Sequence, residues 1–254
     1  MDLGEIALLV AAGLAAGTIN AVAGGGSLVT FPTLLAVGLP PVAANVTNSI
    51  AVSPGYLGSV IGSRYDLVGQ GGRARGVLVT AAVGSATGCA ILLVAPPRSF
   101  EVVVPFLVLG AAAILAFQDR LRQLVGHPAT MSPRRGTVTL HASVGLASVY
   151  GGYFGAALGV MLVALIALVL DESLARVTAL KNLTSLVVGL VTVLVFALFG
   201  PVDWVSVAVV APATIVGGDG GARVARLLPN RVWKATIVIL GTVVGLVLLV
   251  DTFS

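Results

Sequence analysis

Two short polar clusters lie inside otherwise apolar stretches of the chain. They occur in the strings ANVTNSIAV, residues 44–52, and LKNLTSLVV, residues 180–188. Polar side chains inside a membrane are costly, so they usually pair with one another or mark a substrate pathway. Hydroxyls, amides and a single ammonium group suit the binding of a small polar or anionic molecule. The candidate binding residues of the two clusters are Thr47, Asn48, Ser49, Lys181, Asn182 and Thr184.

Catalysis would need a different set of side chains. A membrane-embedded enzyme requires a nucleophile with a general base nearby or a set of metal ligands, and the apolar runs contain neither. His127 and His141 lie 14 residues apart, with no cysteine or carboxylate pattern beside them, so no metal site is expected. Cys89 is the one cysteine, which excludes an intramolecular disulfide. We therefore expect neither an enzyme nor a cofactor.

Lys181 is the one basic residue well inside an apolar run. An offset of 133 residues between the two clusters (181 − 48 = 133) places it opposite Asn48. Its ammonium group could act as a point charge for an anionic substrate. Alternatively, it could extend to the membrane surface or pair with Asp171 or Glu172. The sequence leaves both roles open.

Two glycine-rich breaks precede the polar clusters. The first is AVAGGGSLVTFPTLLAVGLPP and the second is SVYGGYFGAALGV. Glycine lets the backbone approach a ligand closely, and the helix that follows each break begins with N–H groups that favour an anion. Close helix packing through small residues is the alternative explanation, and Gly151, Gly155 and Gly159 form a suitable row. The candidate binding residues at the breaks are Gly24, Gly25, Gly26, Ser27, Gly151, Gly152 and Tyr153.

Asn20 lies one turn before the first glycine break. We expect its amide to be a hydrogen-bond donor aimed near that break and include it in the candidate site. Its alternative role is to link two helices by hydrogen bonding within the membrane.

The composition indicates what kind of elements position these residues. The chain of 254 residues is 57% hydrophobic and 9% charged, whereas a soluble domain carries about 25% charged residues. An integral membrane protein is therefore expected. The net charge of +4 does not indicate nucleic-acid binding, because the basic residues lie in short loops between apolar runs.

The apolar runs predict ten membrane elements. Continuous rather than alternating hydrophobicity favours helices over a β-barrel. The predicted elements are residues 5–23, 26–38, 42–62, 76–95, 101–118, 137–151, 153–170, 173–199, 203–222 and 232–250. Two of them, 26–38 and 137–151, are too short to cross a hydrocarbon core of about 30 Å unaided.

The distribution of basic residues predicts the orientation. With both termini outside the cytoplasm, thirteen of the 14 lysines and arginines lie inside and Arg98 alone lies outside, as the positive-inside rule favours. We therefore expect a multi-pass protein of the cell inner membrane with both termini outside.

The two halves of the chain resemble each other. AAVGSATGCAILLVAPPRSF is similar to TIVGGDGGARVARLLPNRVW, which aligns Gly84 with Gly217 at an offset of 133. Five elements per half require the second half to enter the membrane from the opposite face. The sequence thus predicts an all-α polytopic membrane protein with an inverted-topology repeat, an architecture frequent in secondary transporters. Its parts are a first repeat over 1–118, a cytoplasmic linker over 119–136 and a second repeat over 137–254.

The first glycine break and the cluster after it resemble the signature of the TauE/SafE sulfite-exporter-like family of membrane permeases. The shared features are a glycine-rich break, a proline, Gly-x-Pro-Pro, and then the residues matched here by Ala44, Thr47 and Asn48. The string FALFGPVDW and Lys181 extend the resemblance to the second half. This resemblance implies the movement of small sulfur oxyanions or organosulfonates.

Together these observations predict a secondary permease for small anions such as sulfite, working by alternating access. The expected partners are a small anionic substrate, the lipid bilayer and a coupling proton or cation, and no nucleic acid is expected. An anion channel, or a transporter of another small organic anion, is the alternative function.

Overall fold

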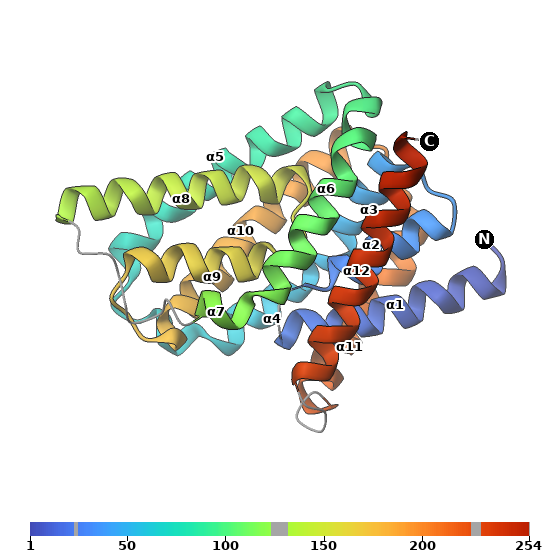
Figure 1. The fold of residues 1–254 in the computed structure, drawn as a ribbon. Helices are drawn as coiled ribbons and strands as arrows, with labels where there is room; N and C mark the ends of the chain where they lie inside the picture. The colour runs from blue at the N-terminus through green and yellow to red at the C-terminus, as the bar shows by residue number, and fades with distance from the viewer. Residues whose placement is uncertain (23–24, 123–131, 225–229, 254) are drawn as a thin grey trace.

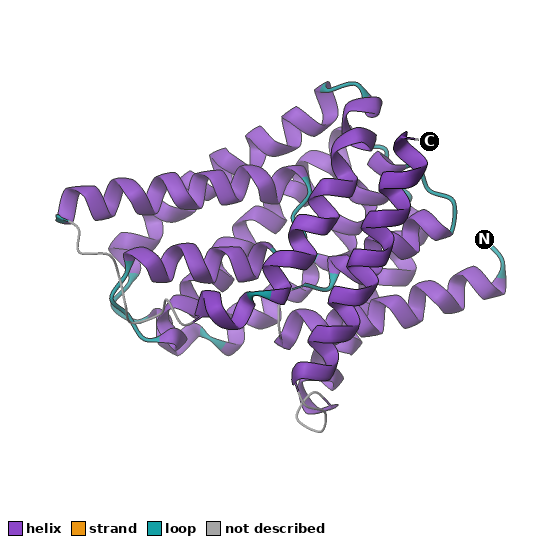
Figure 2. Ribbon diagram, viewed as in Figure 1, coloured by secondary structure: helices purple, strands orange, loops and turns teal. Residues whose placement is uncertain are grey.

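The computed structural model describes residues 1–22, 25–122, 132–224 and 230–253. All regular structure in these residues is helical, as Figure 2 shows. The helices in chain order are α1 (Leu3–Val22), α2 (Ser27–Ala36), α3 (Pro41–Val52), α4 (Pro54–Gly62), η1 (Arg64–Leu67, a 3₁₀ helix), α5 (Gly71–Val94), α6 (Pro97–Ala116), α7 (Gln118–Arg122), α8 (Pro133–Tyr153), α9 (Leu158–Val169), α10 (Leu174–Phe199), α11 (Trp204–Val224) and α12 (Asn230–Phe253).

Local chemistry explains where many helices begin. Helices α3, α4, α6 and α8 each start with a proline. The first helical position suits proline because the N–H that proline lacks would have no partner within the helix there. Helix α10 begins after Ser173, whose hydroxyl accepts the backbone N–H of Arg176 at 3.4 Å.

Helix lengths confirm a membrane protein with several spans. Within the described residues, five helices are long and apolar enough to cross a bilayer, in α1, α5, α6, α10 and α12. Helices α2 and α9 contain 10 and 12 residues. At 1.5 Å per residue they are about 15 and 18 Å long, which is too short to cross.

Two predicted boundaries are wrong. The predicted element 42–62 is divided between α3 and α4, because Pro54 begins a new helix directly after Ser53. The predicted turn at Gly151–Gly152 is helical and belongs to α8, which spans 21 residues and is not short. The break of the second half lies at residues 154–157, where Gly155 (φ 77°) and Ala157 (φ 57°) are left-handed.

Packing explains why the second glycine pair stays helical. A Cβ atom at Gly152 would overlap the backbone carbonyl of Ser85 on α5, and one at Gly88 would overlap the carbonyl of Val149 on α8. Small residues thus allow α5 and α8 to approach at backbone distance. Gly152 therefore takes part in close packing between these two helices.

A second pair of helices makes the same kind of contact. A Cβ atom at Gly17 of α1 would overlap the carbonyl of Thr214, and one at Gly217 of α11 would overlap the carbonyl of Leu14. Helices α6 and α12 also pack together and lie side by side in Figure 1. The main helix contacts therefore join the first half of the chain to the second half.

The predicted linker 119–136 contains helical residues at both ends. Helix α7 covers its start and α8 begins at Pro133 within it. Residues 123–131, including His127, lie outside the described residues.

Candidate functional site

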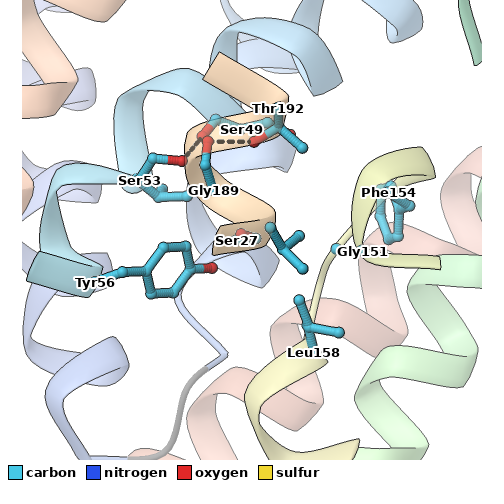
Figure 3. Close-up of a pocket in the computed structure, with 12 residues that line it drawn as sticks. Ser27, Ser49, Ser53, Tyr56, Gly151, Phe154, Leu158, Gly189 and Thr192 are labelled. Atoms are coloured by element: carbon cyan, nitrogen blue, oxygen red, sulfur yellow. Dashed lines mark hydrogen bonds between the residues drawn. The ribbon is translucent and has the colours of Figure 1, made fainter. Parts of the chain in front are cut away.

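A pocket lies where both short helices begin. It contains about 290 Å³ of space between atoms, part of it open to solvent. Figure 3 shows it between α3–α4, the α8–α9 break and α10. Its lining residues are Ser27, Ser49, Val52, Ser53, Tyr56, Gly151, Phe154, Gly155, Leu158, Val188, Gly189 and Thr192.

The amino-terminal ends of α2 and α9 meet at this pocket. Ser27 is the first residue of α2, Leu158 is the first residue of α9, and both line the pocket. The backbone N–H groups of Ala156, Ala157 and Gly159 make no hydrogen bond to another described residue. At the start of α2, by contrast, the N–H group of Gly26 bonds to Asn20 and those of Leu28 and Val29 bond to the carbonyls of Gly25 and Gly26. The open N–H groups at the start of α9 therefore supply positive potential without a charged side chain.

Three hydroxyl groups of the pocket donate to their own helices. Ser49 Oγ donates to the carbonyl of Asn45 at 2.9 Å, Ser53 Oγ donates to the carbonyl of Ser49 at 2.6 Å, and Thr192 Oγ1 donates to the carbonyl of Gly189 at 2.8 Å. Dashed lines in Figure 3 mark the last two bonds. Because each hydrogen is used, these oxygens offer lone pairs to a ligand.

Tyr56 and Ser27 have the opposite character. The ring of Tyr56 extends from α4 into the pocket, as Figure 3 shows. Neither its hydroxyl nor that of Ser27 is hydrogen-bonded to another side chain or backbone group in the described chain. Both hydroxyls can therefore donate to a bound molecule.

The pocket contains three of the predicted binding residues: Ser27, Ser49 and Gly151. Gly24 lies outside the described residues. The remaining predicted residues do not line this pocket; they are Asn20, Gly25, Gly26, Thr47, Asn48, Gly152, Tyr153, Lys181, Asn182 and Thr184. Several of these have partners within the protein that give them a positioning role.

Asn20 fixes the first break as an acceptor, not as the expected donor. Its Oδ1 accepts the backbone N–H of Gly26 at 2.8 Å. A Cβ atom at Gly26 would lie 2.9 Å from the Asn20 amide, so glycine is required for this close approach. Asn20 thus holds the residue directly before Ser27 against α1.

Helix α3 connects three other segments through buried polar side chains. Asn48 Oδ1 accepts a hydrogen bond from Thr30 of α2, and Thr47 Oγ1 accepts the backbone N–H of Asp203 at 3.0 Å. Asn45 Nδ2 donates to the carbonyl of Tyr153, the last residue of α8, at 2.8 Å. These bonds position α2 and the α8–α9 break around the pocket. The sequence predicted a binding role for Thr47 and Asn48 and did not predict this positioning role.

The second polar cluster joins α10 to α4. Asn182 Nδ2 donates to the carbonyl of Ser59 at 3.1 Å and to Ser63 Oγ at 3.0 Å, and Thr184 donates to the carbonyl of Leu180 at 2.8 Å. Lys181 lies eight residues before Gly189 (189 − 181 = 8). Eight residues of helix span about 12 Å.

A cluster of charged side chains lies at the α9–α10 loop and the first turns of α5 and α10, and none of its members lines the pocket. Glu172 accepts from Arg73 Nη1 at 3.0 Å and from Arg176 Nε at 2.7 Å. Arg176 also donates to the carbonyl of Val68 at 3.1 Å. The hydrogen bond from Arg73, followed by that from Arg176, holds the pKa of Glu172 below its ordinary value. This cluster connects the α4–α5 and α9–α10 loops.

Sequence reasoning missed Ser53, Tyr56, Gly155, Gly189 and Thr192. Helical spacing could have identified two of them. Ser53 and Tyr56 lie four and seven positions after Ser49, and residues at this spacing share one face of a helix. Gly189 and Thr192 follow Ser185 at the same spacing in the second half.

A polytopic bundle of apolar helices, with two short helices that start at one pocket, defines the class of the molecule as a helical membrane protein. Comparison with known proteins gives the family. The model of the family described as sulfite exporter TauE/SafE matches residues 9–248. The chain belongs to this family of membrane transporters. The name of the family and the names of the relatives indicate transport rather than catalysis.

Relatives match over nearly the whole chain. A probable membrane transporter protein, YfcA, of Escherichia coli K12 is 28% identical over 247 residues, covering 93% of this chain and 87% of the relative. A probable membrane transporter protein of Haemophilus influenzae is 26% identical over 245 residues, covering 94% and 93%. The chain is also 25% identical to the probable membrane transporter protein ORF9 of a Sinorhizobium species over 251 residues. No solved structure matches.

Proposed function

We propose that the protein is a secondary transporter that moves a small anion through the pocket at the starts of α2 and α9. The observation that carries the proposal is that Ser27 and Leu158, the first residues of the two short helices, line one pocket. Helix N-termini attract anions because their first N–H groups lack partners within the helix. Small sulfur oxyanions or organosulfonates are the substrate class, in line with the description of the family as a sulfite exporter.

An inverted repeat would place the pocket at the interface of the two halves. The α1–α11 and α5–α8 contacts support it, because each joins the first helix of one half to a later helix of the other through glycines. An internal two-fold relation produces contacts in such matched pairs. Alternating access would then be a rocking of one half against the other around the pocket.

We propose that the basic loops face the cytoplasm and that both termini lie on the outer side of the inner membrane. The contacts of Arg73 and Arg176 with the same carboxylate support one face for two of these loops. The two ends of the chain also lie toward one side of the molecule in Figure 1.

A flux screen with purified protein in liposomes tests the function. Radiolabelled sulfite, thiosulfate, sulfate, taurine and methanesulfonate are offered, and protein-free liposomes are the control. We expect at least one anion to enter with a rate that saturates and to exchange with unlabelled anion inside. A rate that rises linearly with concentration would support a channel, and no flux above the control for any anion would contradict transport of this class.

A further inference from the structure

The chemistry of the pocket lining selects among anions by charge. None of the twelve lining residues is Asp, Glu, Lys, Arg or His. The cost of moving an ion out of water grows with the square of its charge, and a carboxylate-sized ion is already costly without a partner charge. Helix starts offer only a fraction of a positive charge each. An uncharged pocket of this kind therefore accommodates a monoanion far better than a dianion.

The hydroxyl groups add a second requirement. Tyr56 and Ser27 have hydrogens to donate, whereas Ser49, Ser53 and Thr192 present lone pairs because their hydrogens bond to helix carbonyls. A fully ionised oxyanion has no hydrogen for those three acceptors. A protonated oxyanion offers an O–H group on one side and anionic oxygens on the other.

We infer that the pocket binds a protonated, singly charged oxyanion, such as hydrogensulfite, in preference to the dianion of the same acid. In this arrangement Tyr56 donates to an anionic oxygen, and the ligand O–H donates to the lone pairs near Thr192. The inference rests on the proposed function and names the protonation state that the transporter recognises.

Few protein groups can titrate near this pocket. In the described parts of the helices that form it, Tyr56 is the one titratable lining residue. The other charged or titratable side chains on those helices are Arg134, Arg135, His141, Tyr150, Tyr153, Arg176 and Lys181. A ligand without an exchangeable proton therefore serves as the control for their titration.

Equilibrium binding to the purified full-length protein separates ligand protonation from proton-coupled transport. Sulfite is titrated from below to above its second pKa, and methanesulfonate, a permanent monoanion without an O–H group, is titrated in parallel. We expect the apparent Kd for total sulfite to rise about tenfold per pH unit above that pKa, while the Kd for methanesulfonate stays constant. A Kd for total sulfite that is constant or falls with rising pH would overturn the inference and leave the proposed function standing.

Two variants connect the effect to the pocket. Tyr56→Phe removes the donor and should weaken both anions about tenfold, whereas Tyr65→Phe, at an exposed residue of η1, should change neither. Thr192→Val removes an acceptor and should weaken hydrogensulfite about fivefold without affecting methanesulfonate. Thr87→Val is its control, since the Thr87 hydroxyl also donates to a carbonyl of its own helix, that of Val83, but on an exposed surface.

The variant experiments can contradict the inference about ligand protonation without contradicting the proposed transport function. If Thr192→Val protein does not fold, as judged by size-exclusion chromatography, Ser49→Ala takes its place with the same expectation. Equal losses for both anions in the acceptor variant would contradict the role of the ligand O–H group. Absence of binding for sulfite and methanesulfonate at every pH, together with no flux in the screen, would overturn the proposed function itself.

Discussion

Gly189 of α10 packs closely against Tyr56 and Ser53 beside the pocket. A Cβ atom there would lie 2.9 Å from Tyr56 Cδ2 and 3.1 Å from Ser53 Oγ. Gly189→Ala should therefore displace the tyrosine ring and weaken anion binding about tenfold, measured as Kd by equilibrium binding.

The matched control for this change is Gly110→Ala on α6, because nothing lies within 4 Å of the added atom. Alanine also favours a helix over glycine by about 1 kcal/mol, so a loss of affinity in Gly189→Ala cannot come from helix propensity. Unchanged affinity in well-folded Gly189→Ala protein would mean that the pocket tolerates the shift of Tyr56.

Asn48 illustrates a polar residue that acts by positioning. Asn48→Ala leaves the buried Thr30 hydroxyl with only its long bond of 3.4 Å to the carbonyl of Gly26, which should cost about 1 kcal/mol. We expect a lower melting temperature in detergent for this variant. Ser49→Ala, a change in the neighbouring lining residue, should instead weaken binding of a protonated oxyanion with little effect on melting. Weaker binding in Asn48→Ala and a lower melting temperature in Ser49→Ala would contradict these roles.

Lys181 is a second candidate source of positive potential at the pocket, besides the helix N-termini. Because it lies about 12 Å along α10 from Gly189, Lys181→Gln should change the Kd for methanesulfonate by less than about threefold. Tyr56→Phe measured on the same preparation gives the scale for a lining residue. A tenfold loss in Lys181→Gln would make its ammonium group part of the binding site after all.

At the scale of elements, the Glu172 cluster joins the loop before α5 to the loop before α10. The pKa of Glu172 is lowered mainly by Arg73, so the folded state favours the ionised carboxylate. Its stabilising effect is present above the ordinary carboxyl pKa and is lost as the pH falls through the lowered value. At neutral pH, Glu172→Gln should lower the stability by roughly 1 kcal/mol.

The measurement is the melting temperature of both proteins as a function of pH. We expect the difference between them to be constant near neutral pH and to shrink under acid conditions. Asp66→Asn serves as the control, because Asp66 lies on neighbouring η1 but forms no ion pair with a described residue. A difference that grows on acidification would contradict the sign of the pKa shift.

At the scale of the whole molecule, the basic loops predict the orientation. In a Cys89→Ser background, a cysteine at Tyr65 should be protected from an impermeant thiol reagent added to intact cells, and one at Arg98 should react. Both positions are exposed in the structure, so accessibility within the protein does not confound the comparison. Labelling at position 65 with protection at position 98 would reverse the orientation.

The sequence by itself determined the class of the protein and most of its helices. Continuous apolar runs with 9% charged residues are possible only for a helical membrane protein, because each span satisfies its own backbone hydrogen bonds. The glycine–proline string of the first half also marked the short helix α2. These features are local, so they can be identified without knowledge of the neighbours of each residue.

Tertiary structure alone decided which polar residues line the pocket. Ser49, Asn48 and Thr47 are consecutive in the sequence, yet helical geometry turns Ser49 to the pocket, Asn48 to α2 and Thr47 to the loop before α11. Likewise Gly151 lines the pocket while Gly152 packs against Ser85. Successive residues of a helix point in different directions, and what each one meets depends on other helices and loops, such as Asp203, which lies 156 residues from Thr47. The chemistry of a side chain therefore determines what it can bind. The packing of the helices determines whether its partner is a ligand or another group of the protein.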